Sequence, residues 1–189
     1  MAGRKRGTAD PHLCGRCSMT MMLKALEYAQ RGWAVFPVHG IVDGRCTCGS
    51  DDCKSPGKHP VFPGGFKNAT TDGETIRDWW SQVPDANVAI ATGEASGIFV
   101  LDVDIGADKS GERSLAELEE RIGRLPAEAV VRTGSGGLHF YFAMPSAPIR
   151  SSASRLGLNL DVRGTGGYVV APPSKHISGN NYTWETLNV

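Results

Sequence analysis

Two aspartates, Asp102 and Asp104, close the apolar run GIFVLDVDIG at residues 97–106. On a β-strand, side chains two residues apart point to the same face, so these carboxylates project together. Like charges this close repel each other unless a cation neutralises them or one carboxylate is protonated. Oxygen ligands in this arrangement suit Mg²⁺ or Mn²⁺, especially where substrate phosphates complete the coordination. The alternative interpretation is a pair of solvated aspartates at the end of a surface strand.

A third carboxylate, Asp161, also lies within an apolar strand pattern, in LNLDVRG at residues 158–164. If this strand lies beside the first, three carboxylates converge. Such a cluster can hold two metal ions that clamp an in-line phosphoryl displacement. Arg163 shares the face of Asp161 because it follows two residues later, and its guanidinium can bind a phosphate through two parallel hydrogen bonds. These residues predict phosphoryl-transfer chemistry that depends on the pairing of two strands.

Glycine-rich turns supply groups that can bind anions. In RTGSGGLHFYF, residues 132–142, three glycines leave backbone N–H groups open to a phosphate, and Ser135 adds a hydroxyl. His139 lies one residue into the following strand, where its ring can hydrogen-bond or charge-pair with a triphosphate. The alternative is a histidine that is satisfied within the sheet. GTGGY at residues 164–168 is a second glycine-rich turn of this kind. The alternative interpretation is an ordinary hairpin with a bulge.

Five cysteines with tight spacing indicate a metal site, because an odd count without a secretory signal argues against a disulfide framework. The segment CTCGSDDCKSPGKHP offers four ligands for tetrahedral zinc: Cys46, Cys48, Cys53 and His59. It has too few apolar residues to order itself, so metal binding can supply its folding energy. Free thiols in a surface loop are the alternative. The remaining pair, Cys14 and Cys17, is assigned to an N-terminal tail.

The bulk composition favours one globular domain. A chain of 189 residues with 40% hydrophobic content can bury a real core. No apolar run reaches the roughly 18 residues of a membrane span, so we expect no transmembrane helix and no membrane partner. The odd number and tight spacing of the cysteines favour a reducing cytosol. The net charge is zero, yet residues 72–123 hold twelve acidic and four basic side chains between two basic segments. That distribution fits a cation site beside a phosphate-binding surface.

Hydrophobic periodicity predicts the elements that must position these groups. Helices are expected at residues 20–31, 73–82 and 114–122. Strands are expected at residues 33–38, 87–92, 97–104, 129–133, 138–143, 158–164 and 167–172, with GSGG as a hairpin turn. Residues 40–66 are expected to form a loop-like module. Helices lie mainly in the first half and strands dominate the second, which indicates an α+β fold with a largely antiparallel sheet.

Three motifs, taken in order, resemble a known family: VLDVD, then TGSGGLHFYF, then LDVRGTGGYVVAPPS. The family is the bifunctional primase–polymerase (prim-pol) domain of the archaeo-eukaryotic primase (AEP) superfamily, which occurs in replication proteins of phages and plasmids. The segments ALEYAQRGWAVFPV, CKSPGKHP and WWSQVPDANVAIATG are similar to the same family. The resemblance runs from about Leu23 to Trp184 and implies a prim-pol catalytic domain at residues 20–189. Residues 1–19, which begin with basic side chains and no apolar segment, are expected to form a flexible tail. The resemblance also implies a primase-like core with an RRM-like, mostly antiparallel sheet and a zinc module at about residues 42–62.

The activity that this resemblance implies is template-directed nucleotidyl transfer from dNTPs or NTPs on a DNA template and primer. The carboxylates that match the family's catalytic Mg²⁺ or Mn²⁺ ligands are Asp102, Asp104 and Asp161. The groups expected to contact the nucleotide's phosphates are Ser135, His139 and, from strand geometry alone, Arg163. The zinc ligands named above match the family's zinc module. Three lysines are hypothesised to hold template or initiating nucleotide there: Lys54, Lys58 and Lys67.

Relatives commonly continue into a helical accessory domain and often a helicase, so this chain is either an excised domain or a stand-alone short form. If it is an excised domain, we expect it to extend primers but to start them poorly. Two rival functions remain open. A metal-dependent phosphodiesterase or nuclease would use the three carboxylates and the histidine for hydrolysis. A non-catalytic, zinc-containing module would bind nucleic acid without reacting. If the gene belongs to a phage or plasmid, the expected compartment is the cytoplasm of a bacterial host.

Overall fold

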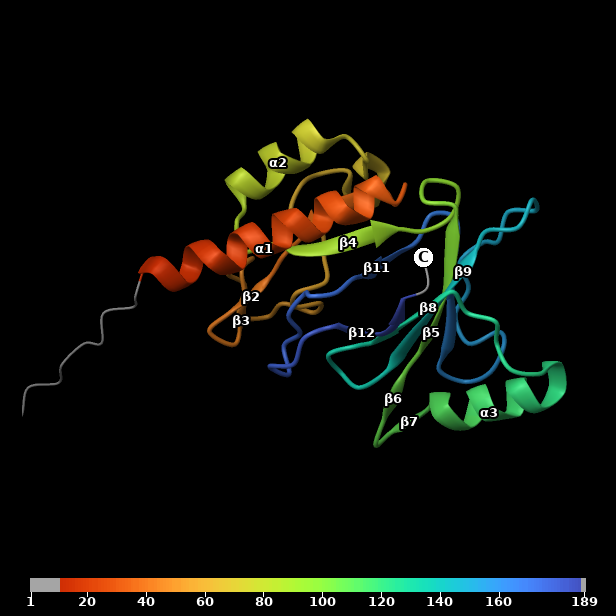
Figure 1. Ribbon diagram of the computed structural model, residues 1–189. Coiled ribbons are helices and arrows are strands. Elements are labelled where there is room, and N and C mark those ends of the chain that lie inside the picture. Colours follow the sequence, from red (N-terminus) through yellow and green to blue (C-terminus); the bar gives the residue numbers. More distant parts are fainter. Residues whose placement is uncertain (1–10, 188–189) are drawn as a thin grey trace, which may run out of the picture.

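The computed structural model describes residues 11–187, and two antiparallel sheets form its frame (Figure 1). The smaller sheet has the strand order β1–β4–β11, where β1 is Val35–Val38, β4 is Asn87–Ala91 and β11 is Tyr168–Val170. The larger sheet has the order β10–β5–β9–β8–β12. Its strands are β10 Leu160–Arg163, β5 Ile98–Val103, β9 Leu138–Ala143, β8 Ala129–Arg132 and β12 Thr183–Leu187.

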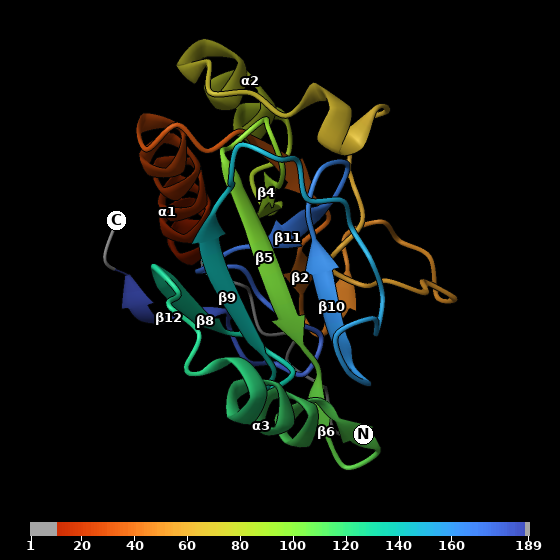
Figure 2. The ribbon, with the colours of Figure 1, turned by 90° about the vertical axis from the view of Figure 1, so that its right-hand side faces the viewer.

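Short elements complete the described part of the chain. Two hairpins stand apart from the sheets: β2 (Ile41–Val42) with β3 (Arg45–Cys46), and β6 (Ile105–Gly106) with β7 (Lys109–Ser110). The helices are α1 Pro11–Gln30, α2 Gly73–Gln82, α3 Gly111–Ile122 and the short 3₁₀ helix η1 Gly65–Asn68. Helices α1 and α2 pack together beside the smaller sheet, whereas α3 lies next to β5 and β10 (Figures 1 and 2).

Helix α3 joins two strands of the larger sheet in a split βαβ unit. Strands β5 and β8 each pair antiparallel with β9, so they run in the same direction with β9 between them. Leu118 of α3 is buried with Leu101, Val103, Leu160 and Val162 on one face of the sheet. This apolar layer holds β5 and β10 side by side and so sets the place of the carboxylates on the opposite face.

The opposite face of the larger sheet is divided between core and site. On β5, Ile98 and Val100 are buried in the main hydrophobic core together with Tyr141 of β9 and Tyr28 of α1. The next residue of β5 on this face is Asp102, because side chains on a strand alternate. The apolar half of the face therefore anchors each strand, and the polar half opens onto the site.

Most predicted elements are confirmed. Helix α2 has the predicted bounds, and Asp72 caps it by accepting a 2.8 Å hydrogen bond from the Thr75 backbone N–H. The GSGG turn joins β8 and β9 as a hairpin. The sheet is antiparallel as expected, but it is divided into two sheets. None of the described helices combines the length and apolar character needed to cross a membrane.

Two boundaries differ from the expectation. Helix α1 begins at Pro11, before the predicted start at Thr20, so residues 11–19 belong to a helix rather than to the expected tail. Residues 1–10 lie outside the described residues. Strand β12 and the two short hairpins were not predicted, because two-residue strands carry no periodicity and no residue of TWETL in β12 is buried.

Candidate active site

Strand register brings three predicted site residues together in the larger sheet. Asp102 of β5 lies directly opposite Asp161 of β10 on one side and His139 of β9 on the other. Residues paired in this way have Cβ atoms about 4.5–5.5 Å apart. The expectation that the strand of Asp161 neighbours the strand of Asp102 is therefore confirmed.

Asp102 is held as an ionised carboxylate. Its side chain is only 18% exposed, with Oδ1 3.4 Å from His139 Nε2 and Oδ2 accepting a 3.2 Å hydrogen bond from Arg163 Nη2. Burial alone would raise the pKa, but the contacts with His139 and Arg163 outweigh it and lower the pKa of Asp102 to about 2. A charged oxygen donor thus faces the site over the whole physiological pH range.

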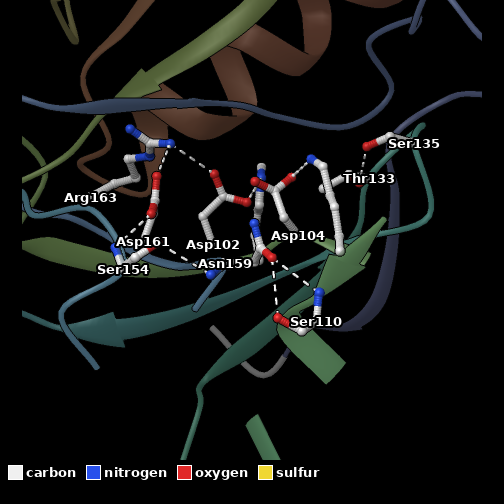
Figure 3. Close-up of polar contacts among 11 residues, drawn as sticks. Asp102, Asp104, Ser110, Thr133, Ser135, Ser154, Asn159, Asp161 and Arg163 are labelled. Atoms are coloured by element: carbon white, nitrogen blue, oxygen red, sulfur yellow. Dashed lines mark hydrogen bonds and ion pairs between the residues drawn. The ribbon is translucent and has the colours of Figure 1, made fainter. Parts of the chain in front are cut away.

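Arg163 bridges two of the carboxylates. The same Nη2 donates a 3.0 Å hydrogen bond to Asp161 Oδ2, so the guanidinium lies between Asp161 and Asp102 (Figure 3). The other oxygen of Asp161 accepts a 3.0 Å hydrogen bond from the Ser154 backbone N–H. The predicted shared face of Asp161 and Arg163 is confirmed, and the guanidinium offsets part of the carboxylates' charge.

Asp104 is paired with a lysine from the hairpin that follows it. Lys109 Nζ lies 2.6 Å from Asp104 Oδ1, because the β6–β7 hairpin turns the chain back toward the end of β5. The Asp104 backbone is fixed on both sides: its N–H donates to the Asn159 carbonyl at 3.0 Å, and its carbonyl accepts from Gly111 N–H at 3.2 Å. Sequence reasoning missed Lys109.

Hydrogen bonds hold the β8–β9 turn, which carries Ser135. Thr133 N–H donates to the Gly137 carbonyl at 2.8 Å, and the hydroxyls of Thr133 and Ser135 are 3.0 Å apart. Two residues outside the turn also hold it: the Gly134 carbonyl accepts hydrogen bonds from Ser178 Oγ at 2.6 Å and Asn180 Nδ2 at 3.2 Å. A Cβ on Gly134 would come within 2.1 Å of another side chain, so only glycine fits there.

His139 is buried rather than open to solvent. It is 5% exposed, and its Nδ1 has no hydrogen-bond partner among the residues that the structure describes. Its Nε2 faces Asp102. The ring lies on the wall of the cavity. The unpartnered Nδ1 differs from the alternative of a histidine satisfied within the sheet, and contact with a nucleotide stays a prediction.

A cavity of about 540 Å³ joins these groups. Its walls include Asp102 and Asp104, Ser135 of the first glycine-rich turn, and Gly166 and Gly167 of the second. Asp161 is not among the described residues that line it. Ligand pockets commonly have volumes of about 300–1,000 Å³, so the cavity has room for a nucleotide-sized ligand.

The predicted cysteine–histidine cluster also assembles. The ligand atoms of Cys46, Cys48, Cys53 and His59 all lie within 4.8 Å of one another. Zinc holds sulfur at about 2.3 Å and nitrogen at about 2.0 Å, so one ion can reach all four with small side-chain movements. A hydrogen bond from the Ser50 backbone lowers the pKa of the Cys48 thiol to about 7, which favours the thiolate that binds metal. The side chains of Cys14 and Cys17 lie outside the described residues.

Other cavity residues carried no usable signal in the sequence. Thr133 contributes a hydroxyl beside Ser135, and Tyr168 contributes an aromatic ring and donates a 3.0 Å hydrogen bond to the Lys58 carbonyl. Lys109 follows an ordinary-looking turn, GADK. Lys109 reaches Asp104 only because the β6–β7 hairpin folds the chain back, and periodicity cannot predict a hairpin with two-residue strands.

Comparison with known proteins agrees with this geometry. The family model for the bifunctional DNA primase/polymerase, N-terminal (Prim-Pol) domain matches residues 25–188. The match includes the carboxylates, both glycine-rich turns and the cysteine–histidine cluster. No curated protein matches the chain. Because the family model covers nearly the whole chain, the protein belongs to the Prim-Pol family.

Proposed function

We propose that this protein is a template-directed nucleotidyltransferase, a DNA primase or polymerase that joins dNTPs or NTPs in phage or plasmid replication. The observation that carries this proposal is the register that sets Asp102 between Asp161 and His139, within a family of primase–polymerases. The expected partners are a DNA template with its primer, and a helical accessory domain and helicase in a longer assembly.

The topology of the larger sheet supports a primase-type core. Strand β5 lies between β9 and β10, although both follow it in the chain, and α3 covers one face of the sheet. This split βαβ arrangement fits the RRM-like sheet that we propose for an AEP core. In this proposal the catalytic domain begins near residue 20, and the zinc module at about residues 42–62 is inserted before the carboxylate strands.

The carboxylate cluster fits divalent cations. Its donors are all oxygens, which suit Mg²⁺ or Mn²⁺. In the structure, Lys109 and Arg163 form ion pairs with these carboxylates and supply the positive charge that balances them. Asp102, Asp104 and Asp161 would hold the metal ions, which when bound activate the primer hydroxyl and neutralise the triphosphate during an in-line displacement.

The chain's own residues would bind and orient the nucleotide. Ser135 and the backbone N–H groups of its turn would hold the phosphates, and Arg163 can donate to them from an N–H edge of its guanidinium. His139 lies on the cavity wall and would contact the phosphates through Nε2, the nitrogen that faces Asp102, because its Nδ1 is buried. None of these roles needs a covalent protein intermediate, because phosphoryl transfer depends mainly on positioning and charge.

The zinc module would contact the template through its exposed lysines. Lys54 and Lys67 are exposed and face solvent near the cysteine–histidine cluster and η1. Lysines that contact DNA phosphates release counterions, so their loss weakens binding and flattens its salt dependence. Replacing both by alanine is expected to weaken single-stranded DNA binding severalfold at low salt, as measured by fluorescence anisotropy, and unchanged affinity would contradict this role.

A labelled primer on a longer template separates the candidate functions. With Mg²⁺ or Mn²⁺ and each nucleotide type, nucleotidyl transfer lengthens the labelled strand, whereas a nuclease shortens it. A binding module leaves the length unchanged and keeps its DNA affinity when Asp102 and Asp104 are both replaced by alanine. We expect lengthening by the wild-type protein and none by this double variant.

A further inference from the structure

The cysteine–histidine loop forms part of the wall of the catalytic cavity. Three of its residues, Ser55, Lys58 and His59, line the same cavity as Asp102 and Asp104. Lys58 directly precedes His59, one of the four clustered metal-ligand residues. Of the lysines in and beside this loop, Lys54 and Lys67 are not among the described residues that line the cavity.

The backbone around Lys58 is fastened to the smaller sheet. Its carbonyl accepts the 3.0 Å hydrogen bond from the Tyr168 hydroxyl, and its N–H donates to the Ser55 carbonyl at 3.1 Å. On either side, the Gly57 carbonyl accepts from Asn87 Nδ2 at 2.9 Å and the His59 carbonyl accepts from His39 N–H at 2.8 Å. The Lys58 side chain therefore starts from a fixed point on the cavity wall.

Lys58 differs from the other cations of the cavity in its charge balance. Lys109 and Arg163 are paired with the carboxylates, whereas Lys58 has no acidic partner in the described part of the chain. Burial, and after it the charge of Lys58, lowers the pKa of His176, the residue packed against Gly134 of the β8–β9 turn. Lys58 and Ser135 of that turn line the same cavity, and an unpaired ammonium in a cavity attracts anions.

We propose that Lys58 binds the phosphate chain of the nucleotide in the cavity, and that a metal ion on the cysteine–histidine cluster holds Lys58 in position to do so. The inference rests on the proposed function for the identity of the ligand. It gives the zinc module a direct part in nucleotide binding, in addition to contact with the template.

The dependence on metal follows from the composition of the loop. Residues 43–59 contribute only Gly57 to the set of fully buried residues, so no apolar core orders the segment. Ligation of His59 would fix the residue next to Lys58, since a metal bound by four side chains supplies the ordering energy that the loop lacks. Without the ion, the loop would keep the β2–β3 pairing and its backbone hydrogen bonds with Tyr168, Asn87 and His39.

Binding of inorganic tripolyphosphate in the presence of Mn²⁺ tests the first half of the proposal. Isothermal titration calorimetry compares the zinc-loaded wild type with Lys58→Met and with the matched control Lys24→Met, which removes the same charge from an exposed site on α1. We expect Lys58→Met to weaken binding about tenfold and Lys24→Met to change it less than about twofold, because charge-assisted contacts are strong and exposed charges are screened. Zinc content and the unfolding temperature of each variant check that the fold is kept.

Removal of zinc tests the second half. Extraction with a chelator is expected to weaken tripolyphosphate binding by wild type to the level of Lys58→Met, and to change the affinity of Lys58→Met little, because the two losses remove one interaction. Additive losses would overturn the link between the metal and Lys58. Equal affinities of wild type and Lys58→Met, or no tripolyphosphate binding by wild type, would overturn the phosphate role.

These outcomes are independent of the polymerase assay. If the protein binds tripolyphosphate through Lys58 yet never lengthens a primer, the proposed function fails and the phosphate role of Lys58 stands. If primers are lengthened with the same nucleotide KM in wild type and Lys58→Met, the proposed function stands and this inference fails.

Discussion

The two predicted metal centres of this molecule are built in opposite ways. The carboxylates lie on neighbouring strands of a five-stranded sheet, where Asp102 is placed by register against Asp161 and His139. The cysteine–histidine cluster lies on a two-residue hairpin and the irregular chain that follows it. Packing of the sheet against α3 positions the carboxylates, whereas the cysteine–histidine cluster has few apolar contacts to position it.

This difference teaches which parts of the site depend on a ligand. Strand pairing and the buried layer beneath β5 and β10 order the carboxylates before any metal arrives, and Lys109 and Arg163 balance their charge meanwhile. The loop has only the two-residue pairing of β2 with β3 and a few backbone hydrogen bonds, without a buried apolar layer of its own. We therefore expect changes at the sheet to alter chemistry or global stability, and changes at the loop to alter local order.

The largest expected effect is on catalysis at the sheet. Asp102→Ala should lower the rate of primer extension by about a thousandfold or more, because metal-ion stabilisation of a transition state is worth several kcal/mol. The variant should fold, since Arg163 keeps its hydrogen bond to Asp161, and it should retain its zinc. Asp108→Ala is the matched control, an exposed carboxylate in the turn of the β6–β7 hairpin, and should extend normally. Extension at the normal rate by Asp102→Ala would return this residue to a structural role.

The next effect is on global stability. Leu160 is fully buried beside Asp161, in the apolar layer under α3. Leu160→Ala should lower the free energy of unfolding by about 2–5 kcal/mol, the usual cost of such a cavity. Chemical denaturation measures this loss, and the folded variant should still bind one zinc. A loss below 1 kcal/mol would mean that this layer does not hold β10 in place.

A smaller, local effect is expected at the loop. Cys48→Ser should release zinc and raise amide hydrogen exchange across residues 44–59 at least about tenfold, because ligand binding supplies the order of this segment. Exchange in β5 and β9 should stay as in wild type. Ser50→Ala, a change at a nearby residue outside the cluster, serves as the control. Loss of zinc with no change in loop exchange would show that the loop orders itself.

The smallest effect concerns the lysine that stands beside Asp104. Lys109→Met removes a positive charge 2.6 Å from a proposed metal ligand. Binding of Mn²⁺ to the nucleotide-free protein should tighten about threefold, a modest gain because this ion pair is partly exposed. Arg113→Met, whose partner is Glu117 on α3, should leave Mn²⁺ affinity unchanged. Weaker Mn²⁺ binding by Lys109→Met would show that Lys109 supports the carboxylates rather than competing with the metal.

Local sequence patterns predicted where helices and strands lie in the chain better than they predicted which strands pair with one another. The bounds of α2 and β9 follow from capping and alternation, which act within a few residues. The division into two sheets was not predicted, because β1, β4 and β11 come from distant parts of the chain. All five residues of β4 are buried, which marks a central strand but does not identify its neighbours.

The same limit applies to the site. Asp161 could be joined to Asp102 only conditionally, since the pairing of β10 with β5 depends on tertiary packing rather than on spacing. The cysteine–histidine cluster could be predicted because its ligands lie within fourteen residues of one another. Lys109 and Tyr168 were out of reach, because a two-residue hairpin and a contact across distant segments leave no local signal.

Templated addition of a single nucleotide tests the central claim most directly. A labelled primer is placed before one known template base, and each of the four nucleotides is supplied alone with Mn²⁺. We predict that only the complementary nucleotide adds one residue, with one pyrophosphate released for each addition. Shortening of the primer, or equal addition of all four nucleotides, would contradict template-directed nucleotidyl transfer by this protein.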